Sequence, residues 1–521
     1  MNIPFVFSKN VKQIITILLL FSNAFLFAQL NLTLDKTDSY YQRDEPIYFN
    51  ITSDVSGTAN YTLKYDNYSA PIESGTVNIS AGQTVTVTHQ TDEPGIVLCT
   101  VFQDGNAATA GAAVAPYEIE AFADEPDDFD DFWNAQKDLL SNIPIDPQLT
   151  FHSSGDYSTT YRINLANIDN RRVYGYISIP DGSGPFPAVI SMPAFGSIAN
   201  TALPDPQLSE RGNAISMTIT IHNVEPDEVD PNAYMPDDIT DENGMYYRYA
   251  ILAGIRSIDY IFSRPDFDGE NLVMTGVSQG AGLSTIVAGL DDRVNFLIMS
   301  NPVLGQVLGL QYEKAGGFPN YINQSRNFVG TADHEALVAE AVNYYDAIYF
   351  AKRFEGVSWT FISYEDFVTP AATSFAVFNA LEGQKFLLHS LNIGHFHPAD
   401  YWNNRYDFLR RFIPASNNPP FPFAPTDQGY FVDAGEDISI ESGETASLTG
   451  TIEYNGTVDP NFDLSWVKKE GPGDVTFSDQ ENYNTNATFS EDGVYVLQLI
   501  ANDYSNDLNG EQKYYTLIDE I

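Results

Sequence analysis

The sequence predicts a mixed architecture: a central α/β domain with a mainly parallel sheet, flanked by two all-β domains. Through residues 119–414, apolar runs of strand length alternate with amphipathic stretches of helix length, which is typical of a parallel α/β sheet. Residues 30–118 and 429–521 instead alternate with period two and contain many turn residues. At 521 residues, the chain is also longer than a single hydrophobic core usually supports.

The charge balance is strongly acidic. The chain has 25 Lys and Arg against 70 Asp and Glu, which gives a net charge of −45. Nucleic acids and anionic membrane surfaces repel such a chain, so we expect neither as a partner. The single cysteine, Cys99, lies in an apolar run and is expected to be buried in a strand. Because the chain has a single cysteine, an intrachain disulfide and a cysteine-based metal site are excluded. We also expect no metal or cofactor.

The N-terminus has the pattern of a secretory signal peptide. Lys9 and Lys12 precede an apolar stretch over residues 14–28. The alternative, a membrane anchor, requires a longer apolar span. We therefore predict a signal peptide over residues 1–28 with cleavage after Ala28, export to the periplasm or the cell exterior, and no membrane anchor after cleavage. No cysteine stands at the predicted cleavage point, where residue 29 is Gln, which excludes a lipid anchor on a mature N-terminal cysteine.

Residues 30–118 predict an immunoglobulin-like β domain. The runs 76–79 and 84–88 alternate with period two, and Ala-Gly-Gln at 81–83 is a turn signal between them. No catalytic constellation is visible in this part of the sequence. We expect a spacer or packing domain rather than a specific sugar-binding domain.

The central domain, residues 119–414, is expected to begin with a helix over 129–141 that follows an acidic patch. A long amphipathic helix is expected over 246–262. Short apolar runs predict the strands of the sheet at 172–180, 187–192, 214–221, 272–274, 296–300, 359–364 and 386–390.

Residues 415–428 form a predicted linker. The stretch 416–425 contains four prolines, which is typical of a stiff, extended segment that few core contacts cross. Residues 429–521 then predict a second all-β sandwich, with Trp466 and a Gly-Pro-Gly turn at 471–473.

The strongest candidate for chemistry is the stretch 271–290. An apolar strand leads into Gly-Val-Ser-Gln-Gly, and a run of small and apolar residues of helix length follows. This is the context of a nucleophile elbow, in which Ser278 stands exposed at a tight turn flanked by Gly276 and Gly280. The backbone amide of Gln279, at the helix start, would face a developing oxyanion. The alternative is an ordinary glycine-rich turn between a strand and a helix.

A serine nucleophile needs a base and an acid, which follow the elbow in the order acid, then histidine, in α/β-hydrolases. His395 lies in a loop after a predicted strand, where a base should lie, and His397 shares that loop. The acid should end the preceding strand, where Glu365 and Asp366 stand side by side. Spacing alone leaves both choices open.

The second oxyanion donor is expected in the loop after the strand at 187–192. That loop reads Pro-Ala-Phe-Gly over 193–196, and the backbone amide of Phe195 is our candidate. The alternative is a loop without a catalytic role.

Several ordered segments of the central domain match one known family. They are Asp128-Phe129-Asp130-Asp131-Phe132-Trp133, Tyr246-Tyr247-Arg248 before the long helix, the elbow with its unusual glutamine, Asp366 with Pro370, and Gly394-His395. By these motifs residues 119–414 resemble the acetyl xylan esterase / cephalosporin C deacetylase family of carbohydrate esterases. The resemblance implies an α/β-hydrolase fold, favours Asp366 over Glu365, and favours His395 over His397.

The sequence also departs from that family at three places. The family's Arg-Gly-Gln motif is replaced by Ile-His-Asn at 221–223, the Glu after the catalytic histidine is Phe396, and the His-Gly-Tyr oxyanion loop reads Pro-Ala-Phe at 193–195. A backbone oxyanion donor survives such changes, whereas local packing and acyl or sugar preference can differ. The family's ring-shaped oligomer is not implied here, because the flanking domains could obstruct it.

At the C-terminus, Val432–Asp437 as Val-Asp-Ala-Gly-Glu-Asp, together with Trp466 and the strand at 493–503, resembles a PKD-type immunoglobulin-like module. The resemblance implies a spacer or adhesive role. For the whole chain we expect a secreted serine esterase that removes acetyl groups from an oligo- or polysaccharide. The alternatives are hydrolysis of another ester or a peptide bond, and a non-catalytic carbohydrate-binding or adhesion protein with a degenerate hydrolase core.

Overall fold

The structure is a computed structural model. It describes residues 30–66, 68, 70–196, 203–230, 233–391, 394–396, 413, 430–454, 457–458, 463–506 and 512–521. The predicted signal peptide, the predicted linker and His397 lie outside the described residues.

The N-terminal part is a sandwich of two β-sheets. Its strands are β1 (Leu30–Leu34), β2 (Tyr40–Tyr41), β3 (Ile47–Ser53), β4 (Gly57–Tyr65), β5 (Glu73–Ile79), β6 (Val85–His89), β7 (Gly95–Gln103) and β8 (Asn106–Val114). One sheet has the order β1-β3-β6 and the other β2-β8-β7-β4-β5. Alternate side chains of both sheets meet in one apolar core, which includes Phe49, Leu63 and Cys99. Cys99 is fully buried in β7, as the sequence predicted, and burial raises the pKa of its thiol to about 12.

The central part is built on a largely parallel sheet. Its strands are β9 (Gln148–Ser154), β10 (Ser158–Ala166), β11 (Arg172–Pro180), β12 (Phe186–Met192), β13 (Ile215–Ile219), β14 (Phe267–Val277), β15 (Phe296–Ser300), β16 (Val357–Ser363) and β17 (Lys385–Ser390). They lie in the order β17-β16-β15-β14-β12-β13-β11-β10-β9. Strands β12 to β17 pair in parallel, and β9, β10 and β11 extend the sheet as antiparallel strands.

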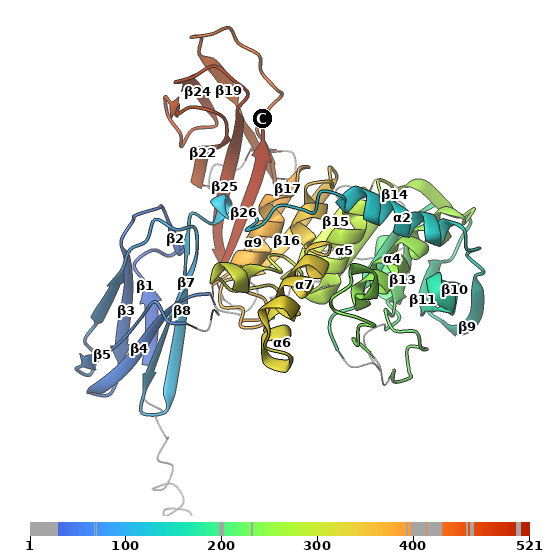
Figure 1. Ribbon diagram of the computed structural model, residues 1–521. Coiled ribbons are helices and arrows are strands. Elements are labelled where there is room, and N and C mark those ends of the chain that lie inside the picture. The colour runs from blue at the N-terminus through green and yellow to red at the C-terminus, as the bar shows by residue number, and fades with distance from the viewer. Residues whose placement is uncertain are drawn as a thin grey trace, which may run out of the picture.

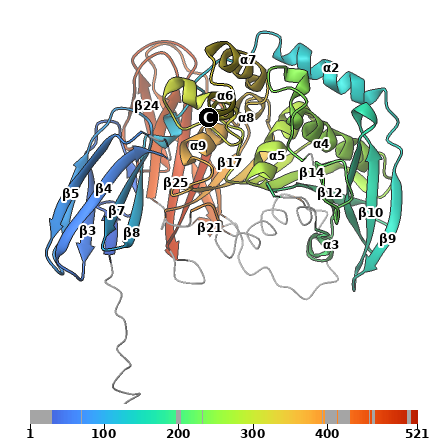
Figure 2. The ribbon, with the colours of Figure 1, turned by 60° about the horizontal axis from the view of Figure 1, so that its bottom comes forward.

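Helices cover both faces of this sheet. They are α2 (Phe129–Ser141), α3 (Pro206–Gly212), α4 (Tyr246–Phe262), α5 (Gln279–Leu290), α6 (Tyr321–Phe328), α7 (Ala332–Asn343), α8 (Ala347–Ala351) and α9 (Ala371–Asn379). Figure 2 shows α3 on the opposite face from α4 and α5. The strand side chains alternate accordingly: Met274 packs into the core under α4 and α5, and Val273 packs into the core on the α3 face. This is the α/β-hydrolase arrangement that the elbow predicted.

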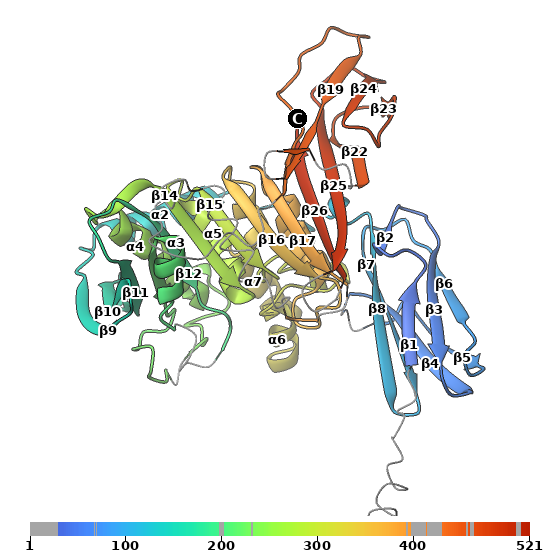
Figure 3. The ribbon, with the colours of Figure 1, turned by 180° about the vertical axis from the view of Figure 1, so that it is seen from behind.

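The C-terminal part continues the central sheet. Its strands are β18 (Tyr430–Asp433), β19 (Ala446–Thr449), β20 (Thr451–Tyr454), β21 (Thr457–Val458), β22 (Asp463–Glu470), β23 (Val475–Phe477), β24 (Asn484–Phe489), β25 (Val496–Asn506) and β26 (Gln512–Glu520). β26 pairs antiparallel with β17, so β22, β25 and β26 belong to one 12-stranded sheet with the α/β strands. Figures 1 and 3 show β25 and β26 lying beside β17.

The expectation that few core contacts cross the boundary before this part is therefore wrong. Trp466 and Leu499 of the C-terminal strands share one apolar core with Phe361 and Leu388 of the α/β sheet. The two parts pack together because β17 would otherwise be an edge strand with unpaired backbone N–H and C=O groups. β26 pairs with these groups. A proline-rich linker indicates where one domain ends, but it does not indicate whether the following domain packs back against the first.

Within the described residues, no helix is both long enough and apolar enough to cross a membrane.

Candidate active site

The turn that the sequence predicts as a nucleophile elbow lies between the end of β14 and the start of α5. Ser278 joins this strand to α5 and has φ 56° and ψ −117°, a conformation that L-residues rarely adopt. Its backbone N–H donates a hydrogen bond to the carbonyl oxygen of Ser300 at the end of β15, at 2.7 Å. The strained turn is thus held from the neighbouring strand and keeps the serine at the carboxyl edge of the sheet.

The two glycines of the elbow are required by close backbone approach. A Cβ on Gly276 would lie 2.1 Å from the carbonyl carbon of Gly280. A Cβ on Gly280 would lie 2.3 Å from the carbonyl oxygen of Met192, the last residue of β12. Any side chain at either position would displace backbone atoms, so glycine is dictated by space.

His395 connects Ser278 to Asp366. Its Nε2 lies 3.0 Å from Oγ of Ser278, and its Nδ1 lies 2.6 Å from Oδ2 of Asp366. The three residues follow β14, β16 and β17, whose carboxyl ends meet at the same edge of the sheet. With the proton on Nδ1 shared with the carboxylate, Nε2 is free to accept the serine hydroxyl proton.

Asp366 is the carboxylate that contacts the imidazole, and it is held in place by its own turn. Its side chain is 1% exposed, and its Oδ1 accepts hydrogen bonds from the backbone N–H groups of Val368 and Thr369 at 2.8 and 2.7 Å. Oδ2 is thereby left to His395. Glu365 makes no such contact, and burial raises the pKa of its carboxyl to about 7.

The side chain of Gln279 ties the elbow to the loop that follows β12. It is fully buried, and its Nε2 donates to the carbonyl oxygen of Pro193 and to the hydroxyl of Tyr234, both at 3.3 Å. Its Oε1 accepts from the hydroxyl of Tyr247 at 3.0 Å. The unusual glutamine of the elbow therefore positions the loop in which the sequence placed a second oxyanion donor.

Phe195 lies in that loop. Its side chain is 50% exposed, and its ring packs against those of Tyr234 and Phe318, with centroids 4.4 and 4.9 Å apart. A half-exposed aromatic ring beside the elbow offers an apolar surface to a substrate.

Comparison with known protein families gives a match over the part of the chain that contains this site. The sequence profile of the acetyl xylan esterase family (AXE1) matches residues 115–411, which is more than half of the chain. The chain belongs to the acetyl xylan esterase family. It is therefore a carboxylic ester hydrolase.

Two kinds of relatives agree with this assignment. The acetyl esterase Axe7A of Xylanibacter ruminicola is 28% identical over 335 residues, covering 60% of this chain and 73% of the relative. Among solved structures, an acetyl xylan esterase from Paenibacillus sp. R4 is similar with a TM-score of 0.52 and 22% identity, over 57% of this chain and 98% of the other. Acetyl xylan esterase 1 from Thermoanaerobacterium sp. JW/SL YS485 is similar with a TM-score of 0.51 and 20% identity, over the same shares. Both solved structures support the α/β-hydrolase fold.

This esterase contains a further residue at the site that the sequence analysis missed. Asn301 follows β15 with φ 47°, and its Oδ1 accepts from the N–H of Ser363 at 2.9 Å. Its Nδ2 lies 3.5 Å from the carbonyl oxygen of Phe396, which follows His395. Asn301 thus links the ends of β15 and β16 to the histidine loop. Its place directly after a predicted strand was the signal that could have indicated it.

The esterase also shows what replaces the family's Arg-Gly-Gln motif. His222 is buried, and its Nδ1 donates to the hydroxyl of Tyr246 at 2.5 Å, while that hydroxyl donates to the carbonyl oxygen of Ile221 at 3.0 Å. The imidazole packs edge-on against Tyr234, whose hydroxyl contacts Gln279. Burial lowers the pKa of His222, and its ring lies in an aromatic cluster that contacts the loop after β12 through Tyr234.

Among the residues that the structure describes, no group of three or more His, Cys, Asp or Glu side chains could hold a metal ion. The arrangement offers nucleophilic chemistry from the chain's own side chains: a serine, an imidazole and a buried carboxylate in hydrogen-bonded order.

Proposed function

We propose that this protein is a secreted serine esterase that removes O-acetyl groups from an acetylated oligo- or polysaccharide. Ser278 is the nucleophile, His395 the general base and acid, and Asp366 the carboxylate that orients the imidazole. The observation that carries this proposal is the pair of hydrogen bonds that His395 makes to Ser278 and Asp366.

The reaction proceeds in two halves. His395 Nε2 takes the proton of the Ser278 hydroxyl as the oxygen attacks the ester carbonyl, and the carbonyl oxygen becomes an oxyanion. Backbone N–H groups of Gln279 and Phe195 stabilise that oxyanion. The tetrahedral intermediate collapses, the C–O bond to the sugar breaks, and His395 donates the proton to the leaving sugar oxygen, which becomes a hydroxyl. Water, deprotonated by His395, then attacks the acetyl-serine ester; the bond to Oγ of Ser278 breaks, acetate leaves, and His395 returns the proton to Oγ.

The family and the relative named acetyl esterase support an acetylated carbohydrate as the substrate class. The half-exposed ring of Phe195 supports it as well, because the apolar face of a sugar or an acyl methyl group can pack on an aromatic ring.

Export is supported by the signal-like sequence at residues 1–28. We place the domains at 30–118, 119–414 and 429–521, with the last joined to the central sheet through β26.

The test is acetate release from acetylated xylo-oligosaccharides by the purified full-length chain. We expect Ser278→Ala to abolish release of acetate from the oligosaccharide and hydrolysis of a chromogenic acetate. Ser284→Ala is the matched control, because Ser284 is buried in α5 and its hydroxyl lacks a hydrogen-bond partner within the described residues. A Ser278→Ala variant with full activity would contradict the proposal, and activity on the chromogenic ester alone would contradict the carbohydrate substrate.

A further inference from the structure

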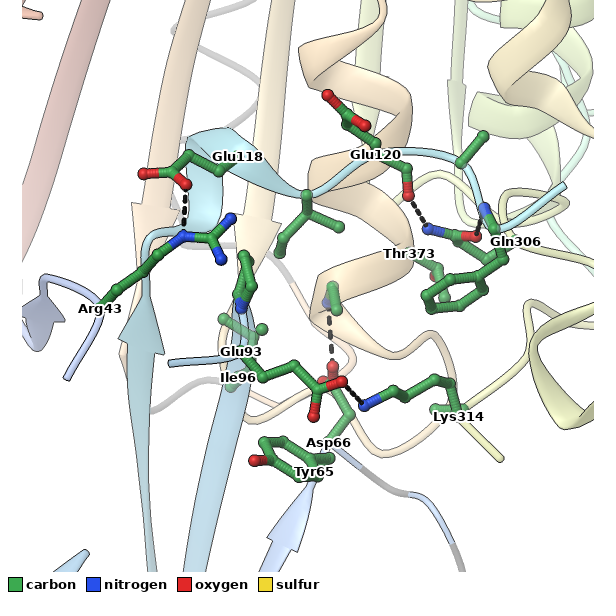
Figure 4. A pocket seen from close by; sticks show the side chains of 17 residues that line it. Arg43, Tyr65, Asp66, Glu93, Ile96, Glu118, Glu120, Gln306, Lys314 and Thr373 are labelled. Carbon is green, nitrogen blue, oxygen red and sulfur yellow. Dashed lines mark hydrogen bonds and ion pairs between the residues drawn. The ribbon is translucent and has the colours of Figure 1, made fainter. Parts of the chain in front are cut away.

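The N-terminal sandwich meets the α/β part along a cavity of about 270 Å³. Figure 4 shows the residues that line it, from both sides of the junction. Polar side chains there pair with each other: Arg43 with Glu118 at 2.6 Å, and Lys314 with Glu93. Because these charges are already paired, the cavity has the character of a junction between domains rather than a ligand site.

One side chain of the sandwich reaches across this junction into the α/β part. Asp66 follows β4, has φ 48° and is 3% exposed. Its Oδ1 accepts from the backbone N–H of Ala371 at 2.9 Å, and its Oδ2 accepts from the N–H of Ala372 at 3.1 Å. Figure 4 shows this carboxylate pointing at the helix. Asp66 therefore caps the N-terminus of α9, whose own N-cap residue, Pro370, has no side-chain acceptor.

Helix α9 begins directly after the short segment that starts with Asp366, the candidate acid. Residues 366–370, which we term the acid segment, run from Asp366 directly to the first turn of α9. Asp366 fixes the start of this segment through its bonds to Val368 and Thr369. Asp66 fixes its end from another domain.

The segment that follows the sandwich also contacts the far end of α9, and β8 of the sandwich contacts Tyr364, two residues before Asp366. At the far end of the helix, Nδ2 of Asn379 donates to the carbonyl oxygens of Pro116 and Ile119, at 2.9 and 3.0 Å. Ahead of the acid segment, Tyr364 packs so closely on β8 that a Cβ on Gly111 would lie 3.3 Å from its Cβ. The helix and the strand end that bracket the acid segment are thus both in contact with the N-terminal domain.

We propose that Asp66 is a positioning residue for Asp366, so that the N-terminal sandwich completes the active site instead of acting as a spacer. The proposal rests on the proposed function, in which Asp366 orients His395. Asp66 acts through the backbone: by holding the first two N–H groups of α9, it fixes the path of the acid segment and with it the carboxylate that faces His395.

The electrostatics of Asp66 support a role other than stability. Burial raises the pKa of this carboxyl to about 7, the two backbone N–H bonds offset part of that effect, and the charge of Asp366 adds to it. The other charged or titratable groups around the cavity are Arg43, Tyr65, Glu93, Glu118, Glu120 and Lys314. Because the folded-state pKa lies above the ordinary value of 3.8, the folded state binds this proton more tightly than the unfolded state. The free energy of unfolding therefore falls as the pH rises towards 7, and the ionised group costs stability.

The test compares Asp66→Asn with wild type in the full-length chain. Asparagine tolerates φ > 0 and keeps one acceptor oxygen, but it turns an NH₂ group towards the second backbone N–H. On a chromogenic acetate we expect kcat to fall by about tenfold, with KM changed by less than about twofold, since a displaced catalytic group affects the chemical step. We also expect the acid side of the pH profile of kcat to become less steep, because the variant lacks the proton that Asp66 takes up near pH 7.

Asp104→Asn is the matched control. Asp104 lies in the turn between β7 and β8 with φ 50°, and it is exposed. Asp104→Asn is the same substitution at a similar backbone φ as Asp66→Asn, but Asp104 lies away from α9. We therefore expect this variant to keep wild-type kcat. A second variant removes the bond from the other side: Ala371→Pro deletes one donor at the first position of α9, where proline suits a helix. It should lower kcat in the same way.

Asp366→Asn, measured in parallel, separates the two proposals. If Asp366→Asn remains fully active, the proposed catalytic role of Asp366 is wrong. If Asp366→Asn is inactive, but Asp66→Asn and Ala371→Pro are folded with wild-type kcat and an unchanged pH profile, the positioning role of Asp66 is wrong. A lowered melting temperature of Asp66→Asn with unchanged kcat would likewise overturn it, because a merely structural cap predicts that result.

Discussion

Lys385 and Glu520 form a buried ion pair that joins the α/β sheet to the C-terminal strands. Nζ of Lys385 lies 3.1 Å from Oε1 of Glu520, and the lysine side chain is 1% exposed. The lysine also donates to the carbonyl oxygens of Asn379 and Leu381, at 3.2 and 2.8 Å. A charge this deeply buried needs its partner, so β17 and β26 depend on each other.

Removal of the C-terminal part should therefore impair folding. A chain that ends at Ala415 lacks β26, and it exposes the edge of β17 and the core around Phe361 and Leu388. We expect aggregation, or a melting temperature well below that of the full chain, in size-exclusion chromatography and circular dichroism. A monomeric truncated protein with unchanged melting temperature and kcat would show instead that the two parts are independent.

Glu520→Gln should destabilise the protein by about 2 kcal/mol, since it removes the carboxylate that is ion-paired with the buried Lys385. Burial lowers the pKa of Lys385 to about 8, below its ordinary value of 10.5, and the charge of Glu520 opposes that shift. The lost attraction therefore matters while the lysine is protonated, and the difference from wild type should shrink as the pH rises above 8.

Urea unfolding at pH 7 and pH 9.5 measures this pH dependence. Glu491→Gln, at an exposed position of the same C-terminal part, is the control and should leave stability unchanged. Equal destabilisation by Glu520→Gln at both pH values would contradict an ionic origin and point to packing.

The base can be tested by comparing the two histidines of one loop. We expect His395→Ala to lower kcat by about 10³-fold or more, because the imidazole of His395 is hydrogen-bonded to Oγ of Ser278 and is positioned to take its proton. His397→Ala should keep most of the activity. Steady-state kinetics on a chromogenic acetate distinguish the two, and the reverse pattern would refute the assignment of the base.

The acid can be tested by comparing two adjacent carboxylates. Asp366→Asn should lower kcat by about 10³-fold or more with the fold retained, because the amide favours the wrong imidazole tautomer. Glu365→Gln should have a mild effect, since its side chain makes no contact with His395 in the described structure. Steady-state kinetics of both variants show which carboxylate is needed for activity, and circular dichroism shows whether each variant is folded. Loss of activity in the Glu365 variant, with Asp366→Asn active, would exchange the two roles.

Much of the α/β part could be predicted from local sequence. The helix predicted over 246–262 and the strand over 296–300 are confirmed with the same bounds as α4 and β15, because their apolar residues recur with the matching period. β9 was missed, because its residues are exposed and show no alternation of burial. A strand that is held by pairing with a neighbour leaves little trace in its own sequence.

The candidate site was predictable to the same extent. Ser278 and its glycines carry a local motif, whereas adjacent strand-end carboxylates such as Glu365 and Asp366 look equivalent until the turn that holds one of them is seen. The contact of Asp66 with α9 and the pairing of β26 with β17 join residues far apart in the chain. No local pattern encodes such contacts, so only the folded structure reveals them.

The most direct test of the central claim is to find which residue carries the acetyl group during turnover. The full-length enzyme is mixed with acetylated xylo-oligosaccharide, quenched in acid within the first turnovers, digested and analysed by mass spectrometry. We predict one acetyl group on the peptide that contains Ser278, absent from the Ser278→Ala variant and from enzyme quenched before mixing. Steady acetate release together with an acetyl group on another residue, or with undiminished release by Ser278→Ala, would contradict the account.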